Sequence, residues 1–165
     1  MRNWNWLPLI AVVALAMELQ AMPATEEEEI AQLYKAGVAG DKQAVEKCIA
    51  FLEATLKHQP GNALARVYLG SAYALRSRDM GFGPGKLAML KQGLTMMDAA
   101  VAAAPHNYRL RLVRGLTTDS MPFFLGRKQS TREDFELLAA IARRDPAQFS
   151  AGDLQAIREH AQRHP

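Results

Sequence analysis

Residues 60–70 read PGNALARVYLG, and residues 105–115 read PHNYRLRLVRG. Pro, Asn, Arg and Gly recur in these two stretches at a constant spacing of forty-five residues, since 105 − 60 = 45. A Pro-X-Asn sequence ends one helix and begins another, and Gly lets a neighbouring helix approach closely. Each stretch follows an amphipathic segment and opens a new one. This pattern is typical of stacked helical hairpins, in which no unit buries its apolar face alone.

Apolar residues at helical spacing extend in both directions from these stretches and predict about seven helices. The expected helices cover residues 27–38, 42–58, 63–76, 86–103, 108–117, 130–143 and a last segment from 150 or 152 to 162. Asp41 is the expected N-cap of the second helix, and Ser130 with Glu133 forms a capping-box pattern for the sixth. Irregular loops are expected at residues 79–86 and 119–129. No run of alternating β-branched residues predicts a strand, so the fold class is all-α.

Several of these residues resemble the tetratricopeptide repeat (TPR). Leu69, Gly70 and Tyr73 match the first half of a repeat. The second half is matched twice, by Gly93, Met97, Ala100 and Pro105 and, one unit earlier, by Cys48, Leu52, Thr55 and Pro60. The resemblance covers residues 27–115. It implies a divergent TPR-like protein of the bacterial cell envelope, folded as a short right-handed superhelix of TPR-like antiparallel helical hairpins.

The resemblance also implies a groove, because the first helix of each TPR hairpin lines a concave face that holds peptides or protein partners. By matching positions, the partner-binding groove is lined by Leu64, Val67, Ser71, Ala74, Arg109, Leu112 and Leu116. The charged clamp that TPR proteins use for acidic tails is not matched at the first three of these positions. We therefore expect a largely apolar groove with a basic margin near Arg109 and Arg111. An apolar peptide, a partner helix or a lipid-like ligand fits such a groove.

The first residues of the chain differ from the rest. Arg2 precedes a nearly all-apolar run at residues 7–17, which is typical of a signal peptide and too short to span a bilayer. We expect a signal peptide at residues 1–21 with cleavage after Ala21 or Ala24, an acidic linker at 22–29 and the TPR-like domain at 30–165. An uncleaved N-terminal anchor is the alternative. The expected localisation is the periplasm or the exterior.

Charge is unevenly distributed along the chain. The net charge is +3, yet residues 66–144 carry thirteen Lys or Arg against six Asp or Glu. Such a section suits an acidic partner or anionic lipid headgroups, or it is a solvated basic face. Basic and aromatic residues do not interleave, so nucleic acid is not an expected partner.

The glycine-rich loop at residues 79–86 is a candidate functional segment, because long loops in helical proteins often carry function. It is not a phosphate loop: Met80 replaces the first required Gly, and Leu87 replaces the Ser or Thr that reaches magnesium. We single out Phe82 and Lys86 in and after this loop.

No catalytic residue, cofactor or metal site is expected. Cys48 falls on an apolar helix stripe and is expected to be buried. His160 and His164 have the spacing of two metal ligands but lack a third, and Glu133 and Asp134 are expected to complement a helix dipole. Core packing is the expected role of the pairs Met96-Met97 and Phe123-Phe124, and an adaptable contact surface is the alternative. The predicted function is an exported adaptor or scaffold for protein–protein interaction, not an enzyme. The alternative is a small-molecule or lipid-binding accessory protein of a transport system.

Overall fold

The computed structural model describes residues 24–163, and within this range the protein is all-helical. The α-helices are α1 (Ala24–Val38), α2 (Lys42–His58), α3 (Ala63–Asp79), α4 (Pro84–Ala103), α5 (Tyr108–Asp119), α6 (Lys128–Arg144) and α7 (Ala151–Arg163). Two short 3₁₀ helices, η1 (Phe123–Leu125) and η2 (Pro146–Gln148), precede α6 and α7. The prediction of an all-α fold with about seven helices is confirmed. The expected signal peptide at residues 1–21 and His164 lie outside the described residues. None of the described helices is long and apolar enough to cross a membrane.

The two matching stretches have the same local structure. The Asn62 side chain accepts a hydrogen bond from a backbone N–H in the first turn of α3, at 2.9 Å, and Asn107 does the same for α5 at 3.0 Å. Arg66 and Arg111 each reach back to the carbonyl oxygen of the proline six residues earlier. The Asn and Arg that recur in the two stretches therefore cap the helix and fix the path of the turn before it.

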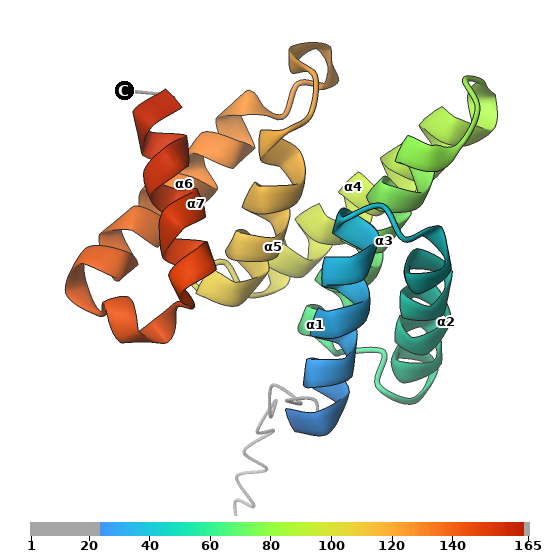
Figure 1. Ribbon diagram of the computed structural model, residues 1–165, viewed down its shortest axis with the longest axis horizontal. Helices are drawn as coiled ribbons and strands as arrows, with labels where there is room; N and C mark the ends of the chain where they lie inside the picture. The colour runs from blue at the N-terminus through green and yellow to red at the C-terminus, as the bar shows by residue number, and fades with distance from the viewer. Residues whose placement is uncertain (1–23, 164–165) are drawn as a thin grey trace, which may run out of the picture.

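Glycine allows a close contact between helices α3 and α4. A Cβ atom on Gly70 of α3 would lie 2.6 Å from the backbone oxygen of Gly93 on α4, and one on Gly93 would lie 2.4 Å from the oxygen of Gly70. The matching Gly115 of α5 faces Phe135 of α6, where an added Cβ would lie 3.3 Å from the ring. Figure 1 shows α3 and α4 as a long hairpin beside the α5–α6 pair. The expectation that glycine permits close packing within each hairpin is confirmed.

Several helix ends differ from prediction by one to three residues, and two of these differences change a predicted loop or linker. α3 and α4 extend to Asp79 and from Pro84, so the expected loop at 79–86 is shortened to four residues and the hairpin projects beyond its neighbours. α1 begins at Ala24, so the four glutamates at residues 26–29, expected in a linker, lie in its first turns. Carboxylates there interact favourably with the positive end of the helix dipole.

The capping box belongs to α7 and not to α6. Ser130 lies inside α6, where its hydroxyl donates to the carbonyl of Arg127, so the predicted pattern with Glu133 is wrong. Ser150 instead accepts from the backbone N–H of Asp153, whose carboxylate accepts from the N–H of Ser150 at 3.1 Å. This reciprocal pair fixes the start of α7 at the first of the two predicted positions.

A buried ion-pair cluster joins α4, α5 and α6. Asp134 is fully buried and accepts two hydrogen bonds of 2.8 Å from Arg114 and one of 2.8 Å from Arg111. Arg114 also donates to Asp98 on α4, which in turn holds Arg127 at 2.6 and 2.9 Å. The prediction that Asp134 complements the dipole at a helix start is wrong, because Asp134 lies beyond the first turn of α6 and pairs with Arg111 and Arg114.

Candidate functional site

A groove of about 720 Å³ lies between the projecting α3–α4 hairpin and the segment that joins α5 to α6. In Figure 1 these are the light-green hairpin tip and the light-orange loop. The lining residues are Tyr34 and Val38 of α1, Ala74, Leu75, Ser77 and Arg78 of α3, Phe82 of the hairpin turn, Lys86, Leu87 and Leu90 of α4, Leu116, Thr117 and the following residues Ser120, Met121, Pro122, Phe124 and Leu125. We call this feature the apolar groove.

Large apolar side chains stand exposed on both rims of the apolar groove. Phe82 at the hairpin tip is 97% exposed, and Phe124 on the opposite rim is 72% exposed. Val38 and Leu87 are also more than half exposed. Phe123 is similarly exposed but does not line the groove, and its ring lies edge-on to Phe124. The prediction that Phe123 and Phe124 belong to the core is wrong, whereas Met97 is fully buried as expected.

Hydroxyl groups close the floor of the groove. The Tyr34 hydroxyl lies 2.7 Å from that of Ser71, which lies 2.6 Å from that of Thr117, and Thr117 donates to the carbonyl of Val113. Burial raises the pKa of Tyr34, which keeps the phenol protonated. These hydroxyl groups join α1, α3 and α5, so α1 covers Ser71, a residue of the predicted groove.

The residues predicted from the TPR resemblance therefore fall in different environments. Ala74 and Leu116 line the apolar groove. Ser71 and Val67 are fully buried, and Leu64 and Leu112 pack against core clusters. Arg109 forms an ion pair with Glu27 of α1, and Arg111 is held by Asp134, so the predicted basic margin at these two arginines is wrong.

Both residues chosen from the glycine-rich loop, Phe82 and Lys86, line the apolar groove. The sequence did not predict the contributions of α1, of Leu87 and Leu90, or of the segment after α5. In the sequence, only the aromatic residue in the glycine-rich turn indicated where the groove lies. The opposite wall comes from a segment more than thirty residues further along the chain, and local sequence does not show that the two meet.

Positive charge gathers at the end of the groove where α1 and α3 terminate. Arg78 forms an ion pair with Asp79 at 3.2 Å and also donates to the backbone carbonyls of Gly37 and Val38. Lys86 donates to the carbonyls of Arg78 and Met80, each at 3.3 Å. The hydrogen bond from Arg78 lowers the pKa of Asp79, and the charge of Lys86 contributes in the same direction. Cations near the ends of two helices also suit their dipoles.

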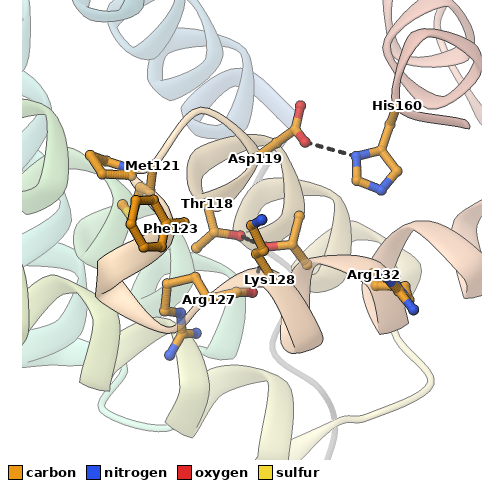
Figure 2. Close-up of a pocket in the computed structure, with 10 residues that line it drawn as sticks. Thr118, Asp119, Met121, Phe123, Arg127, Lys128, Arg132 and His160 are labelled. Atoms are coloured by element: carbon orange, nitrogen blue, oxygen red, sulfur yellow. Dashed lines mark hydrogen bonds and ion pairs between the residues drawn. The ribbon is translucent and has the colours of Figure 1, made fainter. Parts of the chain in front are cut away.

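A second, smaller pocket of about 140 Å³ is lined by the end of α5, the segment that follows it, the first turns of α6 and one residue of α7 (Figure 2). Its edge is formed by Asp119, which accepts hydrogen bonds from His160 at 2.7 Å and Arg163 at 2.5 Å. Burial raises the pKa of Asp119, but these two hydrogen bonds outweigh burial, and the net shift is downward. The basic side chains around the pocket point away from one another in Figure 2, and Arg127 is engaged by Asp98. They do not form an anion site.

No group of three or more His, Cys, Asp or Glu in residues 24–163 could hold a metal ion. Cys48 is 1% exposed, as predicted, and burial raises its pKa to about 11, so the thiol is not a nucleophile near neutral pH. Comparison of the chain with known protein families, with curated proteins and with solved structures finds no match.

Proposed function

We propose that this chain is an exported adaptor that holds an apolar segment of a protein partner of the bacterial envelope in the apolar groove. The observation that carries the proposal is the pair of exposed phenylalanines, Phe82 and Phe124, on opposite rims of a groove lined mainly by apolar side chains. Burying a phenylalanine side chain contributes about 1.5–3 kcal/mol, so leaving two exposed is explained by a partner that covers them. Aromatic side chains are also the commonest anchors in protein interfaces.

The shape of the groove favours a protein segment. Both rims carry exposed side chains, so an occupant contacts the floor and walls while its outer side stays in water. A helix or extended peptide with one apolar face satisfies this condition, because its polar face remains solvated. An acyl chain has no polar face and is better accommodated by an enclosed cavity.

A small-molecule or lipid-binding accessory role is the second candidate. Its support is the groove volume of about 720 Å³, which lies within the range of roughly 300–1,000 Å³ usual for small-molecule sites. The experiments below separate the two.

A divergent TPR-like superhelix is the architecture we propose for this adaptor. Support comes from the repeated use of Asn62 and Asn107 as helix caps and of Gly70 and Gly115 at helix contacts. The adaptor differs from ordinary TPR arrays in two ways: α1 covers part of the concave face, and the lengthened α3–α4 hairpin supplies a wall of its own. Export rests on the signal-like sequence at residues 1–21. Sequencing the N-terminus of the protein recovered from cells tests export, and a mature chain that begins at Met1 refutes cleavage.

Two neighbouring phenylalanines provide a matched test of the groove. We would recover partners from the envelope fraction by cross-linking. The experiment uses the unaltered chain and three variants, Phe82→Ser, Phe124→Ser and Phe123→Ser. Phe123 and Phe124 are exposed and adjacent, but only Phe124 lines the groove. We expect one protein in stoichiometric amount with the unaltered chain and with Phe123→Ser, and its loss with Phe124→Ser and with Phe82→Ser. Equal recovery with all variants, or a co-purified lipid and no protein, would refute the adaptor proposal.

A further inference from the structure

The charge of the apolar groove is one-sided. Among the residues that line it, two are cationic, Arg78 and Lys86, and none is Asp or Glu. Complementary charge fixes the orientation of a bound segment and suppresses wrong partners.

Lys86 is held in a position from which it can bind an anion. Its ammonium group donates to the carbonyls of Arg78 and Met80, at the C-terminal end of α3. An ammonium group has three donors, and two are accounted for by these carbonyls. The third donor is not used by these two bonds, and Lys86 lines the groove. Because the side chain is already ordered by two hydrogen bonds, little further entropy is lost when an anion binds.

The surroundings of Lys86 carry an excess of positive charge. The charges of Arg78, Lys42 and Lys86 all act on one carboxylate, Asp79, and lower its pKa together with the hydrogen bond from Arg78. Of these cations, Arg78 is paired with Asp79, whereas Lys86 lines the groove and is bound to backbone carbonyls. A second carboxylate, brought by a ligand, would reduce the repulsion among them.

From these observations we infer that the partner segment carries a carboxylate side chain, Asp or Glu, beside its apolar residues, and that this carboxylate binds Lys86 at the Arg78 end of the groove. The inference rests on the proposed function, since it describes the occupant of the same groove. The inference defines the orientation and the specificity of the bound segment. Its apolar residues lie between Phe82 and Phe124, and its acidic residue lies at the C-terminal ends of α1 and α3. A single-chain amphiphile with an anionic head offers similar chemistry, but the exposed rims favour a segment with a solvated outer face.

A display library of short random peptides, selected on the full chain, tests the inference without knowledge of the natural partner. Enriched peptides are synthesised, and their affinities are measured by fluorescence anisotropy at low and high salt. Counter-selection on the Phe82→Ser and Phe124→Ser variants removes peptides that bind elsewhere. We expect the remaining peptides to combine large apolar residues with Asp or Glu, and their affinity to fall as salt screens the charges.

Substitutions at Lys86 then locate the carboxylate. Replacing Lys86 by Gln is expected to weaken binding about five- to tenfold, the effect of losing one charge-assisted hydrogen bond at a partly exposed site. Lys91→Gln is the control, since Lys91 is exposed on the same helix and does not line the groove. Replacing the acidic residue of the peptide by its amide is expected to remove the difference between the unaltered chain and Lys86→Gln. Lys86→Glu is expected to bind a peptide in which that residue is Lys. Circular dichroism verifies that each variant is folded.

The possible failures are distinguishable. Groove-dependent peptides without acidic residues, or equal effects of Lys86→Gln and Lys91→Gln, overturn the inference and leave the adaptor proposal intact. If no groove-dependent peptide is enriched, the adaptor proposal itself is refuted, and the inference with it. In that case, calorimetric binding of dodecanoate that depends on Phe82 and Phe124 would identify the groove as an amphiphile site.

Discussion

Replacing Gly93 by Ala should destabilise the protein, although alanine is the better helix former. The new Cβ would lie 2.4 Å from the backbone oxygen of Gly70 and 3.2 Å from the backbone nitrogen of Ala74. Both neighbours are backbone atoms of α3, so no side-chain rotation relieves the overlap, and the two helices must separate. Overpacking of this kind costs typically 1–3 kcal/mol, and we take the upper end because backbone is involved. Alanine returns about 1 kcal/mol of helix propensity. The net loss is therefore about 2 kcal/mol, or a fall in Tm of about 4–8 °C for a chain of this size.

A second glycine of α4 provides the control. A Cβ on Gly85 would meet only the end of the Met80 side chain, at 3.5 Å, an ordinary contact. Gly85→Ala should therefore be neutral or stabilising by up to about 1 kcal/mol. Urea unfolding of both variants, followed by circular dichroism, measures the two changes in the free energy of unfolding. If Gly93→Ala were as stable as the unaltered protein, the close contact of α3 with α4 would be refuted.

Three further outcomes follow from buried or paired groups. Asp134→Asn should lower the free energy of unfolding by about 3–5 kcal/mol, measured by urea unfolding, because the arginine Arg114 is left buried without a full counter-charge. Burial raises the pKa of Asp98, but the hydrogen bonds from Arg127 and Arg114 outweigh it and the net shift is downward. Asp98 should therefore stabilise the fold above its unfolded pKa of about 3.9, and this contribution should be lost as the pH falls through the lower folded value. Thermal unfolding of Asp98→Asn between neutral and acid pH should show a weaker pH dependence below that point, and an unchanged dependence would contradict the assignment. Cys48 should not react with a thiol reagent at pH 8 in the folded protein, because burial raises its pKa to about 11. It should react fully in denaturant. Rapid labelling of the folded protein would show that Cys48 is accessible to solvent and would contradict its burial.

The helices were predictable because their causes are local. The spacing of apolar residues and the punctuation by Pro60, Asn62 and Pro105 act over a few residues, and the structure follows them closely. The recurrence of glycine at position 115 likewise predicted a close helix contact, since a missing side chain has the same effect in each copy of the repeat.

The site was less predictable because it depends on contacts between distant parts of the chain. Tyr34 lies 83 residues from Thr117 in sequence, yet their hydroxyls are 3.3 Å apart, and this contact places α1 over the face where the groove was expected. Asp134 illustrates the same limit: a carboxylate near a helix start normally faces solvent, and only the arrival of two arginines from α5 makes its burial favourable. Phe82 and Lys86 were found because an exposed turn between two helices remains recognisable without tertiary information.

The ion pair between Asp98 and Arg127 has a consequence for the thermodynamics of binding. Helix α4 forms one wall of the groove with Leu87 and Leu90, and further along the same helix Asp98 holds Arg127, just after the segment that forms the opposite wall. One helix of 20 residues therefore carries one wall of the groove and is also tied to the segment of the other wall, so it fixes the distance between them. Because the walls need not close on the ligand, the conformational entropy lost on binding should arise mainly in the partner. If the proposed partner binds here, calorimetry should give the negative heat-capacity change of apolar burial without the larger signature of coupled folding of this chain.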